Sequence, residues 1–403
     1  TIGASTILFN SNLVADTSER KAEKSVIMIY LSGGISATDF INPIPDSPVA
    51  YRSNRGSVKT KSGFLLGGDF SNLAGISDEL SVVRNMNHRD ANHESATGWV
   101  MTSEPHFQAN EQKWPSYGAM AGYVHGTNNP HNGIPTYVKT GSIRYDDAAW
   151  IGSKYMGYDA DAEGLKSMKI TVPQKQFNNR LKMLSLLESN FDNTYGDELA
   201  REWVDLKGQA VNVIQGEASQ AFDLKLEPQA AQDMYGMGTS GFGKNLLMSR
   251  RLVEYGARFV TVNYGGWDMH SDVSGGFERR GPELDKYTTV LIKDLKDRGM
   301  LDNTMIVICS EFSRTPKINT NAGRDHYPGI NSLVFAGGGY DHGRVIGKTD
   351  KNATQVDGIP YTPGDMGNTI LHHLGVSKTL QVTDNAGRPR FVYQRKSKNI
   401  LLA

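Results

Sequence analysis

The sequence lacks a second cysteine, a net charge and a long apolar run. Cys309 is the single cysteine among 403 residues, so an intramolecular disulfide is excluded, although secretion is not. Lys and Arg number 43, as do Asp and Glu, so there is no global basic field that would favour nucleic acid. No apolar run approaches the about 20 residues of a membrane-spanning helix. Any preference for an anion must therefore arise at a local site.

The first residues of the chain allow two interpretations. Residues 1–9 are short, apolar and small, and a polar stretch with Ala15 follows them. This composition is typical of the apolar part of an export signal that has lost its charged start. An ordinary N-terminal strand explains it equally well. Residues 1–24 are therefore read as an export-signal remnant or an N-terminal arm.

Apolar runs that alternate with amphipathic segments predict an α/β fold. Strands are expected at 25–31, 80–83, 257–264, 304–309 and 331–336, and helices at 174–191, 198–222, 242–255, 282–298 and 362–374. The alternation in the second half of the chain predicts a mostly parallel sheet with crossover helices. The main domain is expected to span 25–376, with a helical insertion at about 172–237, and residues 377–403 to form a C-terminal tail. The stretch 99–152, rich in Gly, Pro, Asn and Tyr, is expected to be mostly loops with exposed aromatic residues.

Polar side chains follow three of the predicted strands, at 33–39, 265–272 and 310–328. If these strands are parallel neighbours, the three polar segments meet at the carboxyl edge of the sheet, where open α/β sheets bind ligands. Asp268 and His270 lie two residues apart, and His326 is a natural third partner. A carboxylate with two imidazoles is a zinc-type ligand set that leaves a position open. The alternative is that Asp268 caps a helix and His270 binds a backbone carbonyl.

The other polar residues of these segments also have two interpretations. Glu311 is either a metal ligand or the ion-pair partner of Arg314 or Arg324, and an arginine can orient an anion through its planar fork. Residues 88–98 contain His93 and Ser95 close to a predicted helix start, where a hydroxyl can attack or hold an anion. A simple helix cap by Asn92 or Ser95 is the alternative there.

Four segments, 252–268, 311–316, 323–328 and 336–339, make the chain similar to a known family, and the last three form an ordered signature. On these segments it resembles the bacterial domain-of-unknown-function family 1501, which is placed near the alkaline phosphatase and sulfatase superfamily. The resemblance covers residues 26 to about 375. It implies an alkaline-phosphatase-like α/β fold, with a central mostly parallel sheet flanked by helices and a helical insertion. It also favours export, to the periplasm, the cell surface or the medium.

The resemblance implies roles for individual residues. Asp268, His270 and His326 match an Asp, His, His metal set, and Glu311 falls where the superfamily has the Asp of a second site. Phe312 stands in place of the His of that second site. Residues 93–96 fall near the nucleophile segment, with Ser95 or Thr97 as the attacking hydroxyl, and no formylglycine-type Cys is present there.

Two further departures lie in the loop after the first strand. The family's loop usually contains a Pro and a His, where this chain has Ile35 and Ala37, while Ser36 and Asp39 are kept. Asn42 also stands where an acidic residue is common. Each change removes a possible ligand, so the expected cofactor is a divalent metal, zinc first, with one ion or none.

Two functions follow as hypotheses. The first is an exported metal-dependent hydrolase of a small anionic ester or a sulfated or phosphorylated glycan. In it, Asp268, His270 and His326 hold the metal, with Glu311 and Asp39 in support. Arg314 and Arg324 orient the anion, and His93 and Ser95 belong to the catalytic segment. The alternative is a non-catalytic secreted surface or assembly subunit with a protein partner or with self-association. Metal content and ester turnover distinguish the two.

Overall fold

The structure is a computed structural model that describes residues 23–105, 113–160, 172–195, 204, 207–208, 211 and 218–403. Nearly all of the predicted export segment lies outside the described residues. Most of the predicted helix at 198–222 does as well, so the helical insertion is described only in part.

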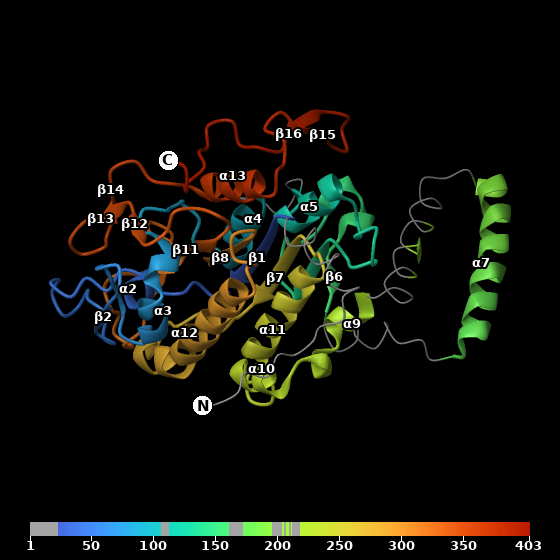
Figure 1. The fold of residues 1–403 in the computed structure, drawn as a ribbon. Coiled ribbons are helices and arrows are strands. Elements are labelled where there is room, and N and C mark those ends of the chain that lie inside the picture. Colours follow the sequence, from blue (N-terminus) through green and yellow to red (C-terminus); the bar gives the residue numbers. More distant parts are fainter. Residues whose placement is uncertain are drawn as a thin grey trace, which may run out of the picture.

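An eight-stranded sheet forms the centre of the molecule, in the order β12-β4-β11-β8-β1-β7-β5-β6 (Figure 1). Its strands are β1 (Ser25–Tyr30), β4 (Leu80–Val83), β5 (Tyr137–Thr140), β6 (Tyr158–Asp159), β7 (Phe259–Asn263), β8 (Thr304–Cys309), β11 (Leu333–Gly337) and β12 (Arg344–Ile346). The central strand β1 runs parallel to both β7 and β8. Within this sheet β11 is antiparallel to both of its neighbours, β8 and β4. The mostly parallel sheet expected from the sequence is confirmed.

Helices cover both faces of this sheet, which explains why its central strands are apolar throughout. All six residues of β1 and of β8 are buried. Ile27 and Ile29 belong to a core with α11 (Gly241–Glu254) and α12 (Val273–Asp297). Val26 and Met28 belong to a second core with α4 (His93–Thr102), α5 (Tyr117–His125) and α13 (Pro363–His373). Figure 1 shows these two groups of helices on opposite sides of the strands. A strand buried on both faces has no polar alternation, as parallel sheets require.

The described α-helices are α2 (Ala37–Phe40), α3 (Ser71–Gly75), α4 (His93–Thr102), α5 (Tyr117–His125), α7 (Gln174–Tyr195), α9 (Ala218–Phe222), α10 (Gln229–Met234), α11 (Gly241–Glu254), α12 (Val273–Asp297) and α13 (Pro363–His373). The start predicted for α12 was wrong. The helix begins at Val273, capped by the Asp272 side chain, and Pro282 lies inside it. Proline costs a helix interior about 3 kcal/mol, and burial of α12 against α11 and α3 outweighs that cost.

The stretch 99–152 consists mostly of loops and short elements. It holds part of α4, all of α5 and the strand β5, which pairs with β7 and β6. Tyr117 and Tyr137 are buried. The other described aromatic side chains in this stretch are half-buried, and none of those described is exposed. The expected exposed aromatic residues were therefore a wrong prediction, and four of these rings, Tyr117, Tyr123, Tyr137 and Trp150, pack in the second core.

The C-terminal residues pack against the body of the fold. Strands β15 (Gln381–Thr383) and β16 (Pro389–Phe391) form a hairpin beside α13 (Figure 1). Ile400 and Leu401 are buried, and the Ile400 N–H donates to Thr369 Oγ1 over 2.8 Å. Residues 377–403 thus cover one side of α13 rather than extending from the domain.

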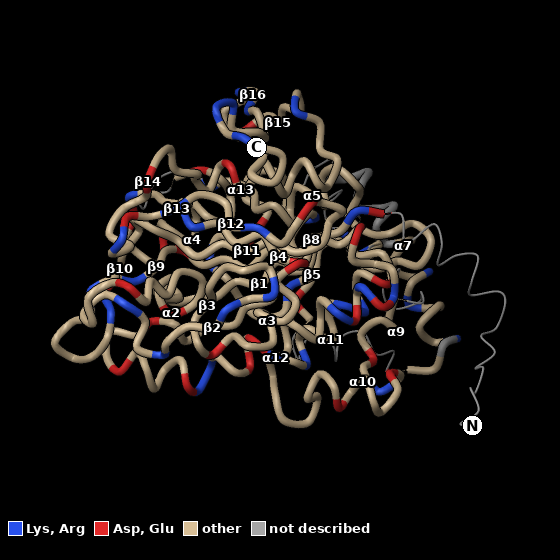
Figure 2. Tube along the Cα trace, turned by 60° about the vertical axis from the view of Figure 1, so that its left-hand side comes forward, with Lys and Arg blue, Asp and Glu red and all other residues tan. Residues whose placement is uncertain are grey.

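Three further strand pairs lie outside the central sheet: β2 (Ser57–Lys59) with β3 (Leu65–Gly67), β9 (Ser313–Arg314) with β10 (His326–Tyr327), and β13 (Lys348–Thr349) with β14 (Val356–Asp357). Charges of both signs are interspersed over the fold in Figure 2. Within the described part of the chain, no helix combines the length and apolar character that crossing a bilayer requires.

Candidate metal centre

Three neighbouring strands bring the predicted polar segments together. The order β8-β1-β7 places Glu311 after β8, Gly33 after β1 and Asp268 beyond the end of β7. Gly33 has φ +111°, and a Cβ atom on it would lie 2.5 Å from the Asp268 backbone nitrogen. Glycine is thus required for the turn after β1 to approach the Asp268 loop.

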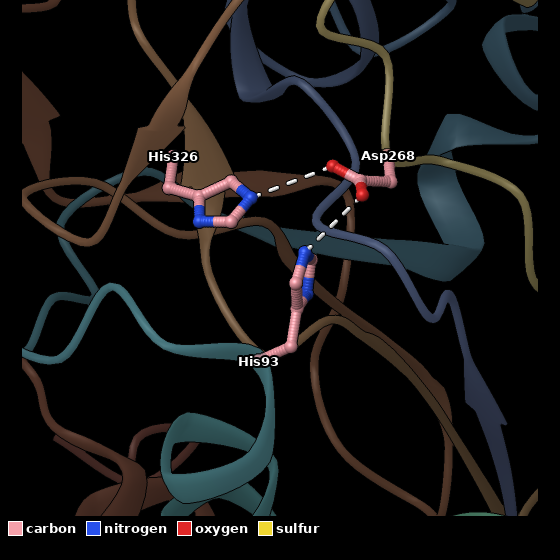
Figure 3. Close-up of side chains that lie close together, drawn as sticks. All are labelled: His93, Asp268 and His326. Carbon is pink, nitrogen blue, oxygen red and sulfur yellow. Dashed lines mark hydrogen bonds and ion pairs between the residues drawn. The ribbon is translucent and has the colours of Figure 1, made fainter.

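The carboxylate of Asp268 is the point on which three imidazoles converge. Its Oδ1 lies 3.0 Å from His270 Nε2 and 3.4 Å from His326 Nε2. Its Oδ2 lies 3.5 Å from His93 Nε2, and the two imidazole Nε2 atoms of His270 and His326 are 3.0 Å apart. Figure 3 shows His93 and His326 pointing toward Asp268 from different parts of the chain.

The Nδ1 atom of each of these imidazoles donates a hydrogen bond to an acceptor other than Asp268. His326 Nδ1 bonds the backbone carbonyl of Ala91 over 2.8 Å, and a carbonyl can only accept. His93 Nδ1 bonds the Glu311 carboxylate over 2.7 Å, and His270 Nδ1 bonds the Asp325 carboxylate over 2.9 Å. All three Nδ1 atoms therefore carry a hydrogen, and each Nε2 atom faces the Asp268 carboxylate.

Lone pairs and a carboxylate that face one another repel unless a cation or a proton lies between them. His93 Nε2 is buried and has no hydrogen-bond partner. The ligand atoms of His93, Asp268 and His326 all lie within 4.8 Å of one another. Atoms bound to one tetrahedral zinc are about 3.4 Å apart, given Zn–N and Zn–O bonds of about 2.1 Å. Outer hydrogen bonds that orient ligand imidazoles are typical of zinc sites. The ligand types and their orientation therefore suit a divalent cation, and binding it would draw ligand atoms that now lie within 4.8 Å of one another closer together.

The charges around the centre shift its pKa values. The hydrogen bond from His93 to Glu311 raises the pKa of His93, against the effect of burial. Burial opposes ionisation of Asp268, but the adjacent Arg314 outweighs it and lowers the pKa of Asp268. Burial is the main cause that lowers the pKa of His326. Asp268 is thus held as a carboxylate and His326 as a neutral imidazole, the forms in which both bind metal.

Phe312 fills the place that the family resemblance assigned to a second metal ligand. Its side chain is fully buried, with its ring centroid 4.8 Å from that of His93 and 4.6 Å from that of His326. The ring packs against both imidazoles and excludes water from behind them. This apolar contact holds the two rings in place but provides no ligand atom.

Glu311 and Asp39, which were predicted as metal ligands, bind other groups. Glu311 is buried, and its Oε1 accepts from the Gly33 N–H over 2.8 Å as well as from His93. It lies behind His93 and orients that ring. Asp39 is buried too, with Oδ1 bound to Ser53 and Oδ2 bound to Ser36 and Arg324. The structure does not bring Asp39 to the Asp268 cluster.

The two arginines predicted to orient an anion are fully buried, and their donors are occupied. Arg314 donates to the carbonyls of Gly34 and Arg324 over 2.9 and 3.2 Å, and also to Gly33 O and Asp268 Oδ1. Arg324 donates to Asp39 over 2.8 Å and also to the backbone carbonyls of Thr315, Pro316 and Arg52. Arg314 fixes the position of Asp268, and Arg324 fixes the loop that carries His326.

A cavity of about 420 Å³ opens beside the centre. It is lined by Tyr30, Ser32, Gly33, His93, Glu94, Thr97, Ser142, Ile143, Arg144, Asn263, Asp268 and Glu311. Ser95 is not among these residues. Asn92 caps α4 through its side chain, which accepts from the Glu94 and Ser95 N–H groups. Thr97, also in α4, does line the cavity. Its hydroxyl donates to His93 O over 2.6 Å.

Sequence reasoning missed two features of this site. It placed His93 in the catalytic segment and not among the ligands, although its position at the start of α4 directs Nε2 at Asp268. It also missed Arg144, which follows β5, a strand that was not predicted. The pairing of His93 with Glu311 joins segments 218 residues apart, and no local pattern signals such a pair.

A family model described as "Protein of unknown function (DUF1501)" matches residues 23–401. The chain belongs to the DUF1501 family. A search of curated proteins finds no match to this DUF1501 protein.

Among solved structures, a sulfatase from Pseudoalteromonas sp. is 12% identical with a TM-score of 0.43, covering 98% of this chain and 74% of its own. A phosphonate monoester hydrolase from Silicibacter pomeroyi is 11% identical with a TM-score of 0.36, covering 88% and 73%. A TAB5 alkaline phosphatase variant with Mg bound is 9% identical with a TM-score of 0.37, covering 88% and 98%. These likenesses are distant, so the function is inferred below from the site's own residues.

Proposed function

We propose that this DUF1501 protein is an exported metal-dependent hydrolase of phosphate or sulfate esters. The observation that carries the proposal is the convergence of three imidazole Nε2 atoms on the Asp268 carboxylate, with every Nδ1 committed to an outer acceptor. A structural ion-pair network does not need all three rings in the same tautomer. A metal centre does, because the ligand nitrogen must be unprotonated.

The residues that would hold the ion are Asp268, His93 and His326, and His270 lies beside them, with Nε2 3.0 Å from both Asp268 Oδ1 and His326 Nε2. Two imidazoles and one carboxylate favour zinc among the common divalent ions and leave a position open for water. A cation bound there would polarise an ester oxygen and lower the pKa of a water molecule. The adjacent cavity of about 420 Å³ is large enough for a small ester.

The surrounding residues orient Asp268 and the imidazoles and limit the choice of attacking group. Arg314, fully buried, holds the Asp268 carboxylate in position. Glu311 and Asp325 orient the His93 and His270 rings and fix their tautomers. Ser95 does not line the cavity, whereas Thr97 does but already donates to a backbone carbonyl. We therefore propose water as the attacking group.

Metal content tests this proposal directly. The full chain is purified without chelator, its metals are measured by mass spectrometry, and zinc affinity is measured by calorimetry. One ion per chain is expected, together with hydrolysis of an aryl phosphate or aryl sulfate that D268N and H326Q abolish. H131Q, which changes an exposed histidine far from the centre in sequence, is the matched control. A chain that contains no divalent metal and has no affinity for zinc would refute the proposal.

One observation favours a second function, a non-catalytic surface or assembly subunit on the same fold. Phe312 stands where the family resemblance placed a ligand of a second ion, and Asp39, expected to support an ion, is paired with Arg324 instead. A single ion can then stabilise a binding surface without turnover. A chain that binds zinc tightly but hydrolyses neither class of aryl ester, and self-associates, would fit this function.

Export remains part of the proposal and depends on the composition of residues 1–9. Fractionation of cells that carry the natural gene, followed by detection of the protein, tests it. Protein found outside the cytoplasm is expected.

A further inference from the structure

The cavity beside the metal centre needs a positive charge to hold an anionic ester. Three carboxylates, those of Asp268, Asp325 and Glu311, surround the imidazole rings. Arg314 and a divalent cation would balance these three charges and leave no surplus. Glu94, at the cavity, adds another negative charge. An anionic substrate therefore requires a further cation, which the buried Arg324 does not supply because its donors are occupied.

Arg144 is the one residue with a permanent positive charge among the described residues that line the cavity. Its side chain is 67% exposed and pairs with Glu94, which is 58% exposed. An ion pair so exposed to water contributes little stability and exchanges easily. Arg144 can therefore leave Glu94 for a better anion, and its planar guanidinium matches the oxygens of a phosphate or sulfate group.

The backbone that carries Arg144 is held on both sides. The carbonyl of Ser142 accepts from the side chain of Asn263, the last residue of β7, over 2.8 Å. The carbonyl of Asp147 accepts from the Ser116 N–H over 2.9 Å, at the start of α5. The loop is thus anchored while the guanidinium is free to move, an arrangement suited to ligand capture. Glu94 follows His93 directly in α4, so an anion that replaces Glu94 lies beside the metal centre.

We propose that Arg144 binds the anionic group of the substrate and that Glu94 occupies Arg144 until the anion replaces it. The inference rests on the proposed function, since it assigns the group that recognises the ester's anion in that same site. Arg144 is a substrate-binding residue here, and Glu94 competes with the substrate.

Binding of inorganic phosphate to the full chain tests the inference, measured by calorimetry at one low salt concentration with and without zinc. R144Q is expected to weaken phosphate binding about tenfold, and E94Q to strengthen it about threefold, because the competitor and its repulsion are removed. K348Q, in an exposed pair with Asp357 on the β13–β14 hairpin, is the matched control and should leave the affinity unchanged. Equal affinities of R144Q and the unaltered protein, or no phosphate binding by the unaltered protein, would overturn the inference.

The measurements separate this inference from the proposed function. A chain without metal whose phosphate binding still depends on Arg144 refutes the hydrolase but supports the anion site. A chain that binds zinc and turns over an aryl ester, with phosphate affinity and KM unchanged in R144Q, refutes the anion site alone. In an active enzyme, R144Q should raise KM while kcat stays within about twofold, and R144K should restore part of the affinity.

Discussion

Zinc should raise the unfolding temperature of this protein, and D268N should remove that effect. Asp268 is the group that all three imidazole Nε2 atoms approach, at 3.0 to 3.5 Å. Asn has the same shape as Asp but no charge, so the substitution leaves the imidazoles without their shared carboxylate. Arg314 keeps its bonds to the backbone carbonyls of Gly34 and Arg324, so the variant should still fold.

The size of the effect follows from linkage. Free zinc at 1,000 times its Kd stabilises the folded state by about 4.1 kcal/mol. An unfolding entropy of about 2.1 cal/mol/K per residue gives about 0.85 kcal/mol/K for 403 residues. The expected rise in Tm is therefore about 5 °C.

Replacement of Asp325, the carboxylate that accepts from the His270 ring, should reduce the zinc-induced rise in Tm only in part. Asp325 accepts from His270 Nδ1 over 2.9 Å, and its side chain is 55% exposed, so D325N should barely change the metal-free protein. Loss of such an outer bond typically weakens metal affinity 10- to 100-fold. The zinc-induced rise in Tm should then be about 2 to 3 °C smaller than in the unaltered protein.

Differential scanning fluorimetry with buffered zinc provides the measurement, with each variant compared with and without metal. H131Q should show the full rise. A rise below about 1 °C in the unaltered protein, or the same rise in D268N, would show that the imidazoles and Asp268 do not form a metal centre.

Three other predictions concern different parts of the fold. R324M should lower the free energy of unfolding in urea by about 3 to 5 kcal/mol, because it leaves Asp39 buried without its partner; an equally stable variant would contradict this. G323A should weaken zinc binding at least tenfold by calorimetry, because a Cβ atom there would overlap the His270 backbone and displace it. Burial lowers the pKa of His373 to about 4, so its contribution to stability is present above about pH 6.5 and lost as the pH falls through about 4. Loss of about 3 kcal/mol is expected over that range in urea titrations, and H373Q should remove that part of the pH dependence.

The bounds of strands that are buried on both faces could be predicted from the sequence. Strands β4 and β8 begin and end at the predicted residues, because a strand buried on both faces is a continuous apolar run with polar ends. Strand β5 was missed because its short apolar pattern is interrupted by Lys139, whose stem is buried while its charge pairs with Asp159. Its place in the sheet depends on pairing with β7 and not on its own composition.

The part of the site that follows the ends of predicted strands could be predicted from the sequence. Asp268 and His270 follow a strand that the apolar pattern revealed, and His326 belongs to the segment that follows β8, so their meeting was expected. The role of His93 depends on where α4 begins, and Asn92 fixes that start through its cap. Arg314 and Arg324 were predicted to orient an anion, but both are buried and donate to backbone carbonyls. A sequence does not show that a charged side chain will be surrounded by such acceptors.

The position of β1 at the centre of the sheet has a consequence for synthesis of the chain. Ser25 begins the strand, and its neighbour Thr304 on β8 lies 279 residues later. At about 5 to 20 residues per second, a ribosome takes about 14 to 56 s to cover that distance. Throughout this interval a strand whose six residues are all buried in the folded protein has no partner on that side. Contacts so distant in sequence also slow folding. We therefore expect the emerging chain to need a chaperone on β1 until β8 has been made.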